Sequence, residues 1–463
     1  MLVLRRTKWI AIGPAAMIGL TVMALAQSMT PPVGYKVDAT RLGPVDKKGL
    51  SPAVSRDGDH FAYARDLGQT TCVVVDGQAG TEYDGIGLGS LVLSSDGKHV
   101  AYEAVKDRKT FMVVDGQAGP PYDGIGSPPV FSLDGKRIAY MAGLGAKQFV
   151  VVDGREGPRY DGIGANSLLF SPDGRRVAYN AQTGEKWSVV VDGRTGQAYD
   201  GTGGGAIFSP DSRRVAYAAF NAGKWLVVVD GQVSPELDEI GKGDLSFSPD
   251  STRIAYAARR GKKWRAVVNG KAGVEYDGIA RNSLSFSNDG ARMAYVAMRG
   301  ERQFVVVDGQ ESAEYDVIYE GTPVLSPAGK HTVYAAARGG KRFVVVDGKV
   351  GAVYDRTGFP VFSPDGTRLA YPAQKGEKQV VVVDGKEGAE FDSIGKVLFS
   401  LDSKRVAYEA KVGHDSVVVV DGHAGGTLDL VIANGPTFHP DGSLEFLAFK
   451  DHSFYRIKYL PPA

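Results

Sequence analysis

Hydrophobic residues gather in short runs along this chain, and turn-forming residues separate the runs. Residues 166–200 show the pattern: NSLLFS, RRVAYNA, KWSVVVD and GQAYD follow one another, and their valines, tyrosines and phenylalanines favour strands. SPDG, between the first two runs, has the proline and glycine spacing of a type I turn, and DG between the last two is a hairpin signal. The pattern predicts four short strands and, beyond residue 26, no helix of useful length.

This four-strand unit recurs along nearly the whole chain after residue 50, which is the signature of a repeat architecture. The aspartate of the SPDG turn returns in steps of 37 to 39 residues, with Ala328 in its place once: Asp57, Asp96, Asp134, Asp173, Asp211, Asp250, Asp289, Asp365, Asp402 and Asp441. The aspartate of the VVVDG turn keeps the same period, with Asn269 in its place once: Asp76, Asp115, Asp153, Asp192, Asp230, Asp308, Asp347, Asp384 and Asp421. These positions define ten complete units and an eleventh, partial one.

The valine triplets indicate strands that are buried on both faces, because a strand with one face in water alternates apolar and polar residues. A four-stranded sheet packed between two like sheets meets that condition, and four strands in about 40 residues is the blade of a β-propeller. The fold class is therefore all-β. Since single rings usually hold about four to eight blades, eleven units fit either one large ring or two rings. The last unit supplies three strands, and residues 34–43 resemble the missing fourth, which would close one ring.

Four copies of one motif carry a family resemblance: FSPDGRRVAY, FSPDSRRVAY, FSPDSTRIAY and FSPDGTRLAY. They resemble the WD-repeat-like propeller repeat of the TolB C-terminal domain, which also occurs in the propellers of prolyl-oligopeptidase-type peptidases. The resemblance covers essentially all of the predicted mature chain. It implies a propeller and is compatible with a role near the cell envelope. The VVVDG and YDGIG half of each unit is less typical of that family, and no part of the chain has the pattern of the peptidases' α/β-hydrolase domain.

Residues 1–26 have the pattern of a secretory signal peptide. Arg5, Arg6 and Lys8 precede an apolar stretch, and the small residues Ala24-Leu25-Ala26 predict cleavage before Gln27. We therefore expect a periplasmic or secreted protein with no stable membrane span after signal removal; retention of the segment as an anchor is the alternative. Residues 27–50 form an N-terminal segment that contains the possible closing strand, and residues 51–463 form the repeat array.

Composition narrows the function classes. Lysine plus arginine numbers 54 and aspartate plus glutamate 53, which argues against a nucleic-acid binder, since such domains carry a marked basic excess. Cys72 is the single cysteine, so no intramolecular disulfide can form, and its valine-rich surroundings predict a buried, unreactive thiol.

The repeated aspartates are predicted to form turns, because a catalytic group is needed once and not in every unit. The histidines do not occur at metal-ligand spacing, and a GxSxG nucleophile elbow is absent. We expect no catalytic residue, metal or cofactor. A propeller hydrolase or lyase with its site at the channel remains an alternative.

Binding candidates lie where the units differ from one another. Trp187, Trp225 and Trp264 each follow a lysine at the entry of a third strand, and they either pack between blades or form an aromatic strip. The neighbouring loops are basic and are either solvated and partly neutralised by the YDG aspartates or part of a binding arc. The candidate residues in these loops are Arg259, Arg260, Lys262, Lys263, Arg338, Lys341 and Arg342.

These patterns predict an exported, non-catalytic binding scaffold of the cell envelope whose partner is a protein. A module that binds carbohydrate or another acidic ligand, with the tryptophans as stacking surfaces, is the second hypothesis.

Overall fold

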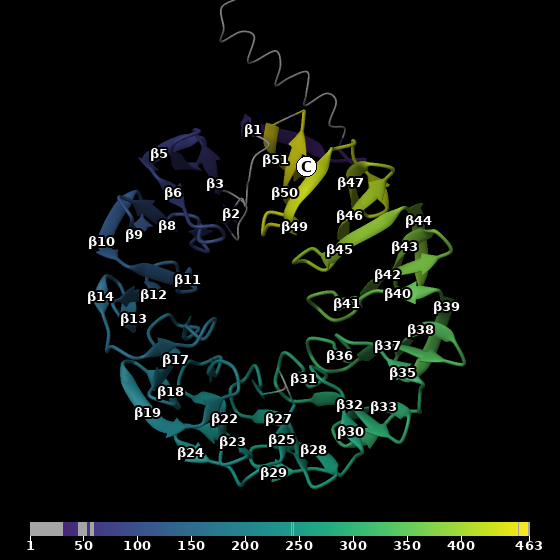
Figure 1. Cartoon of the computed structure of the whole chain (residues 1–463). Coiled ribbons are helices and arrows are strands. Elements are labelled where there is room, and N and C mark those ends of the chain that lie inside the picture. The colour runs from purple at the N-terminus through teal and green to yellow at the C-terminus, as the bar shows by residue number, and fades with distance from the viewer. Residues whose placement is uncertain are drawn as a thin grey trace, which may run out of the picture.

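The computed structural model describes residues 31–44, 53–55, 60–241, 243, 245–451 and 453–461. The regular elements of these residues are all β-strands, and they form eleven antiparallel sheets arranged in one ring (Figure 1). The chain is thus an eleven-bladed β-propeller, and one ring, not two, accommodates all units. The signal-peptide prediction and Asp57 fall outside the described residues.

Within each blade the strands are ordered from the centre of the ring outward, as Figure 1 shows. Blade 1 contains β2 (Ala53–Val54), β3 (Phe61–Asp66), β4 (Thr71–Val75) and β5 (Gln78–Tyr83). Blade 2 contains β6 (Gly85–Ile86), β7 (Val92–Leu93), β8 (Val100–Lys106), β9 (Lys109–Val114) and β10 (Gln117–Tyr122). Blade 3 contains β11 (Gly124–Phe131), β12 (Ile138–Leu144), β13 (Lys147–Val152) and β14 (Arg155–Glu156). Blade 4 contains β15 (Gly162–Ile163), β16 (Leu169–Phe170), β17 (Val177–Thr183), β18 (Lys186–Val191) and β19 (Arg194–Tyr199).

The next four blades repeat this arrangement. Blade 5 contains β20 (Gly201–Thr202), β21 (Ile207–Phe208), β22 (Val215–Asn221), β23 (Lys224–Val229) and β24 (Gln232–Val233). Blade 6 contains β25 (Glu239–Ile240), β26 (Ser246–Phe247), β27 (Ile254–Arg260), β28 (Lys263–Val268) and β29 (Lys271–Ala272). Blade 7 contains β30 (Gly278–Ile279), β31 (Ser285–Phe286), β32 (Met293–Arg299), β33 (Arg302–Val307) and β34 (Gln310–Glu311). Blade 8 contains β35 (Val317–Ile318), β36 (Val324–Leu325), β37 (Thr332–Arg338), β38 (Lys341–Val346) and β39 (Lys349–Tyr354).

The last three blades complete the ring. Blade 9 contains β40 (Arg356–Thr357), β41 (Val361–Phe362), β42 (Leu369–Lys375), β43 (Lys378–Val383) and β44 (Lys386–Phe391). Blade 10 contains β45 (Ser393–Phe399), β46 (Val406–Val412), β47 (Asp415–Val420) and β48 (His423–Ala424). Blade 11 contains β49 (Leu430–Phe438), β50 (Leu444–Lys450), β51 (Ser453–Leu460) and β1 (Lys36–Pro44).

The predicted four-strand unit is present in blade 4, with one addition. The four expected strands correspond to β16, β17, β18 and β19, but β15 also pairs with β17, alongside β16. The innermost strand is therefore made of two short pieces. The first piece comes from the YDGIG segment, which the sequence pattern did not predict to be a strand.

The two ends of the chain close the ring together. β1 pairs antiparallel with β51, with Lys36 opposite Leu460 and Val37 opposite Tyr459. Blade 11 in turn packs on blade 1, where the rings of Phe61 and Phe454 lie 4.9 Å apart. The segment that resembled a missing fourth strand supplies this outer strand, so the blade that ends the sequence is completed by residues from its beginning.

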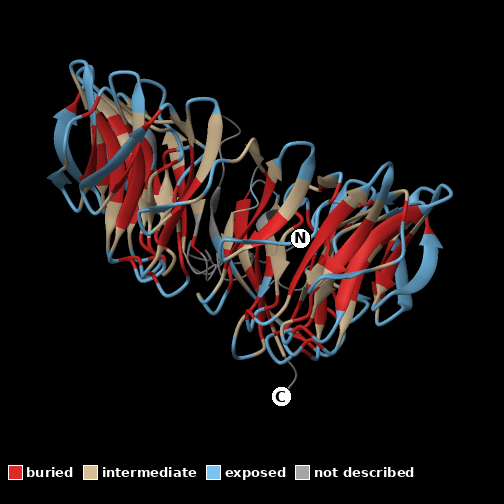
Figure 2. Cartoon of the chain, turned by 90° about the horizontal axis from the view of Figure 1, so that it is seen from below, coloured by how far each residue is buried: buried red, intermediate tan, exposed pale blue. Residues whose placement is uncertain are grey.

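The core lies between the blades, as the buried band in Figure 2 shows. Consecutive valines of one strand face opposite neighbours: Val190 of β18 packs in a cluster with residues of blade 3, and Val189 packs with residues of blade 5. Both side chains are buried, which confirms that the valine triplets mark strands covered on both faces. Cys72 is likewise buried in such a cluster, between blades 1 and 11.

Antiparallel pairing places the connections on two faces of the ring. We call the face that carries the SPDG and VVVDG turns the turn face; in blade 4 it contains residues 171–176 and 191–194. The opposite face carries the loops between second and third strands together with the YDG segments, and we call it the loop face. In blade 4 the loop face contains residues 183–186 and 199–203.

Candidate partner-binding surfaces

The VVVDG aspartates form turns within their own blades. Asp192 and Gly193 both have positive φ, 52° and 75°, which is the type I′ geometry that Asp or Asn followed by Gly tolerates. Asp192 Oδ1 accepts a hydrogen bond from the backbone N–H of Val177 at 3.0 Å, and Oδ2 accepts one from Nε–H of Arg176 at 3.0 Å. The turn interpretation of this repeated aspartate is confirmed by these contacts.

Arg176 extends this turn into a clamp across the blade boundary. Its Nη1 donates to the backbone carbonyl of Arg213 in blade 5 at 3.0 Å, and its guanidinium lies 5.2 Å from the ring centre of Phe208 in that blade. We call this arrangement of arginine, turn aspartate and next-blade aromatic ring the arginine clamp. It recurs with Arg137, Arg214 and Arg368, whereas in other blades His60, His99 and His331 contact the turn aspartate through Nδ1. The repeat pattern does not predict this clamp, although the second basic residue of FSPDGRRVAY is a visible signal.

The other repeated aspartates are also structural. Asp173 of SPDG accepts the hydroxyl of Ser171 and the N–H of Arg175, and the serine hydrogen bond is the main reason that the pKa of Asp173 is lowered. Asp200 of YDG accepts Nζ of Lys186 and the N–H of Ala222, which lies in the next blade. The lysine hydrogen bond, followed by the backbone one, lowers the pKa of Asp200. These carboxylates therefore stabilise turns and blade contacts.

Blade 6 departs from the clamp. Asn269 keeps the turn: its Oδ1 accepts the N–H of Ile254 at 2.9 Å, but its Nδ2 stands where the other blades have a carboxylate oxygen and points to the carbonyl of Thr252 at 3.4 Å. Arg253 still stacks 5.1 Å from the ring centre of Phe286 in blade 7. One of its guanidinium nitrogens, Nη2, is buried without a hydrogen-bond partner.

The three candidate tryptophans lie at the loop face, and all three are partly buried. The ring centres of Trp225 and Phe220 lie 5.3 Å apart. The Trp225 ring also packs against Gly203 of the same blade, where it fills the space that a Cβ atom would need. Trp264 packs against the cluster shared with blade 7. Other units place glutamine at the same position, where Gln148 Oε1 accepts the N–H of Ile163 in the next blade at 2.8 Å. The tryptophans thus occupy a position that faces the following blade and leaves part of the ring in solvent.

The basic candidates of the loop face divide into paired and unpaired side chains. Lys263 contacts Asp277 at 2.6 Å and Arg259 contacts Glu239 at 3.1 Å, while Arg338 and Arg342 lie over the rings of Tyr315 and Tyr319. The remaining members of the set are exposed and form no ion pair with any described residue: Arg260, Lys262 and Lys341. The structure brings the tryptophans and these cations to the same face of the ring.

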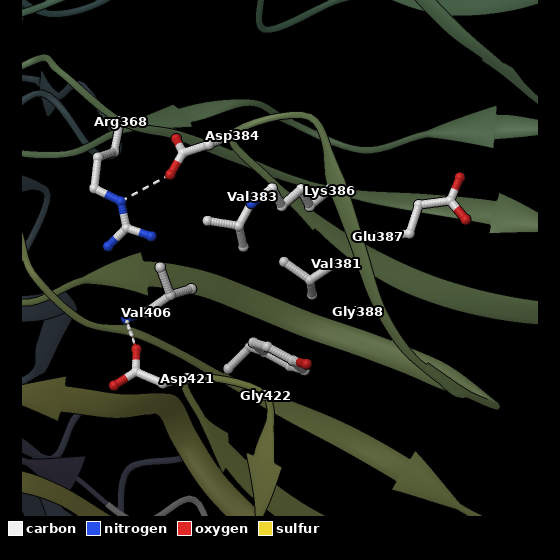
Figure 3. A pocket seen from close by; sticks show the side chains of 11 residues that line it. Arg368, Val381, Val383, Asp384, Lys386, Glu387, Gly388, Val406, Asp421 and Gly422 are labelled. Carbon is white, nitrogen blue, oxygen red and sulfur yellow. Dashed lines mark hydrogen bonds and ion pairs between the residues drawn. The ribbon is translucent and has the colours of Figure 1, made fainter.

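Two clefts open on the turn face, and they occupy equivalent places between different blades. The first lies between blades 9 and 10 and has a volume of about 370 Å³ (Figure 3). Val381 and Tyr408 form its apolar part, and Asp384, Glu387 and Asp421 are among the charged residues around it. The second lies between blades 5 and 6 and has a volume of about 460 Å³. Sequence reasoning did not predict either cleft, because each needs two neighbouring blades.

The described residues contain no group of three or more His, Cys, Asp or Glu that could hold a metal ion. Among the same residues, no helix is long and apolar enough to cross a membrane.

Comparison with known proteins gives similarities of fold. No family model matches this sequence, and no curated protein matches it. Among solved structures, a eukaryotic initiation factor is similar with a TM-score of 0.41 and 14% identity over 79% of this chain and 98% of that chain. TolB from Acinetobacter baumannii has a TM-score of 0.25 and 14% identity over 62% and 79% of the two chains. The GH74 enzyme of Niastella koreensis has a TM-score of 0.28 and 12% identity over 88% and 83%. The assignment of the propeller rests on the strand pairing and ring closure described above.

Proposed function

We propose that this chain is an exported, non-catalytic scaffold of the cell envelope and that it binds a protein partner on its loop face. The observation that carries the proposal is a group of exposed cations without ion-pair partners among the described residues: Arg260 and Lys262 in blade 6 and Lys341 in blade 8. The other lysines and arginines of these loops are largely held by carboxylates or aromatic rings. Charges left free on a rigid surface attract an acidic partner and fix its orientation.

The architecture supports this proposal. Each blade is tied to the next by buried valines, by hydrogen bonds to the YDG aspartates and, at many boundaries, by a clamp. Loops displayed on such a fixed frame lose little conformational entropy when a partner binds. The resemblance of the repeats to TolB-type propellers and the predicted signal peptide are the reasons for proposing the envelope as the location.

A pull-down from an envelope extract of the source organism tests the proposal. Three baits are compared: the wild-type chain, a loop-face variant and a matched control. The loop-face variant has charge reversals at Arg260, Lys262 and Lys341. The control has charge reversals at three exposed turn-face residues, Lys98, Lys136 and Arg213. We expect the wild-type chain and the control to retain the same partner at low salt, and high salt and the loop-face reversals to release it, because exposed charges are screened. A partner that is retained equally by all three baits would contradict the role of the loop face.

The partly buried tryptophans favour a second candidate, a carbohydrate-binding module. Trp187, Trp225 and Trp264 lie in consecutive blades and leave part of each ring in solvent, the arrangement that stacks on sugar rings. Titration with alginate oligosaccharides, followed by intrinsic tryptophan fluorescence, tests it. Saturable quenching that disappears when Trp225 is replaced by alanine supports the module; unchanged emission would remove it.

A further inference from the structure

The cleft between blades 5 and 6 differs from its counterpart in charge. Around the cleft between blades 9 and 10 stand Arg368 and Lys386, but also the carboxylates of Asp384, Glu387 and Asp421. The residues that line the cleft between blades 5 and 6 are Arg214, Val227, Val229, Gln232, Val233, Ser234, Pro235, Thr252, Ile254, Tyr256, Asn269 and Gly270. The one cation of this second lining, Arg214, is paired with Asp230 at 3.0 Å, as Arg368 is paired with Asp384. Val233 and Asn269 occupy the positions of Glu387 and Asp421, so two of the three carboxylates of the first cleft have no counterpart in the second.

Asn269 accounts for one of these two missing carboxylates. It occupies the position of Asp421, and it lines the cleft. The substitution removes a negative charge from the cleft wall and, at the same time, removes the carboxylate that would hold Arg253. Arg253 is left with a buried, unpartnered Nη2 and no ion pair, although its charge contributes to lowering the pKa of Asp250. An asparagine here therefore leaves this part of the turn face more positive than the equivalent part of blades 9 and 10.

The cleft also has an apolar floor and an apolar edge. Val227, Ile254 and Tyr256 are buried at its base, and Val233 on the outer strand β24 is 46% exposed. Leu237 stands where the neighbouring units have Tyr199 and Tyr276, so Tyr256 lacks the tyrosine contact that Tyr217 and Tyr295 have. Valine rims and a buried tyrosine accept an aliphatic side chain, whose burial provides affinity.

We propose that the cleft between blades 5 and 6 binds a short peptide segment of a protein partner in which an aliphatic residue stands next to an aspartate or glutamate. The aliphatic side chain lies against Val227, Val233 and Tyr256. The neighbouring carboxylate lies at the rim, where the terminal guanidinium nitrogens of Arg214, whose Nε is held by Asp230, and the amide of Asn269 can donate hydrogen bonds. The proposal rests on the proposed function, since it names the class of protein segment that the scaffold recognises at a second surface.

Asn269→Asp is the decisive variant, because it restores the residue that the other units use. It returns the carboxylate that holds Arg253, so the variant should fold at least as well as the wild type, and lost binding cannot be ascribed to unfolding. Asp421→Asn is the matched control: it makes the reverse change in the equivalent cleft between blades 9 and 10. Val233→Glu adds a carboxylate at the rim through a side chain that is largely in solvent.

The experiment starts with a random dodecapeptide display library selected on the full wild-type chain. The dissociation constants of the enriched peptides are then measured by fluorescence anisotropy on the wild type and the three variants. We expect enriched peptides with an acidic residue next to Val, Leu or Ile, a tenfold or larger loss of affinity in Asn269→Asp and Val233→Glu, and affinity within twofold of the wild type in Asp421→Asn. Replacing the acidic residue of the peptide with its amide should cause a similar loss.

Two outcomes would overturn the proposal: no enriched sequence, or enriched peptides whose affinity is the same in Asn269→Asp and wild type. Either outcome is distinct from failure of the loop-face proposal. A partner that is released by the loop-face reversals, together with either of these two peptide outcomes, supports the scaffold and removes the cleft. Peptide binding that depends on Asn269, in a chain with no salt-sensitive envelope partner, supports the cleft and removes the loop-face interaction.

Discussion

The arginine clamp makes a quantitative prediction about how blades hold together. Arg176→Met keeps the aliphatic stem but removes the guanidinium and with it the ion pair, the ring contact and the hydrogen bonds to the carbonyls of Ser212 and Arg213. The ion pair with Asp192 is partly exposed and contributes about 0.2–1 kcal/mol. The contact with Phe208 contributes about 0.5–1 kcal/mol, and the hydrogen bond to the carbonyl of Arg213 about 1 kcal/mol. We expect the free energy of unfolding to fall by about 2 kcal/mol in total.

The assay is urea unfolding followed by circular dichroism, with Arg175→Met as the matched control. Arg175 is the preceding residue, and its side chain is 84% exposed. Its Nε lies 4.0 Å from Oδ2 of Asp173. Its replacement should change the free energy of unfolding by less than about 0.5 kcal/mol. Equal m-values among the wild type and the two variants would show that the same cooperative unit unfolds in each.

A second substitution separates the ion pair from the rest of the clamp. Asp192→Asn reproduces in blade 4 the arrangement that blade 6 has naturally, and it should destabilise the chain less than Arg176→Met. The double variant should lose less than the sum of the single losses, because both single variants remove the same ion pair. Equal losses in Arg175→Met and Arg176→Met, or full additivity with Asp192→Asn, would refute the clamp.

Three further predictions concern ring closure, acid stability and the tryptophan position. Deletion of residues 36–44 removes the outer strand of blade 11 and should raise amide hydrogen exchange in β51 far above that in β18; unchanged protection of β51 would contradict closure by β1. Hydrogen bonds from Ser363 and Ser443 are the main reason that the pKa values of Asp365 and Asp441 are lowered to about 2. These carboxylates therefore stabilise the fold above their unfolded pKa near 3.8, and the contribution is lost as the pH falls from about 4 to about 2. Urea unfolding midpoints measured at pH 7, 4 and 2.5 should decline only in the acid range. Trp264→Gln should lower the free energy of unfolding by less than about 1.5 kcal/mol in urea, because the glutamine can accept a hydrogen bond from the N–H of Ile279, as Gln148 does from that of Ile163. A loss equal to that of Trp264→Ala would show that no such hydrogen bond forms.

The sequence could predict what depends on neighbouring residues. The strands of blade 4, the type I′ turn at Asp192-Gly193 and the burial of Val189 and Val190 all follow from local chemistry and from the repeat period. The number of rings did not follow, because closure depends on the small rotation between successive blades, which accumulates over the whole chain. Residues 34–43 were the only local sign of it, through their similarity to an outer strand.

The candidate sites were predictable only in part, for a related physical reason. Trp225 and Lys262 stood out because they differ from the residues of other units, and the structure places them on the same face. The arginine clamp was missed because Arg176 and its partner Phe208 belong to different units and meet only after the blades pack. The clefts were missed for the same reason: Val227 and Tyr256 line one pocket but come from blades 5 and 6.

The positions at which single units differ from the repeat indicate where a specific function can lie. A residue that every unit contains is explained by a task that every blade shares, such as a turn, a clamp or a buried contact. A specific partner instead needs a surface that occurs once. Blades 5 and 6 provide such a surface on both faces of the ring: Trp225 and Trp264 lie at the loop face, and Asn269 and Leu237 alter the junction that carries the cleft of the turn face. Because each of these residues replaces one that the fold uses elsewhere, changing it back to the repeat residue should preserve folding and remove binding, which separates function from structure at single positions.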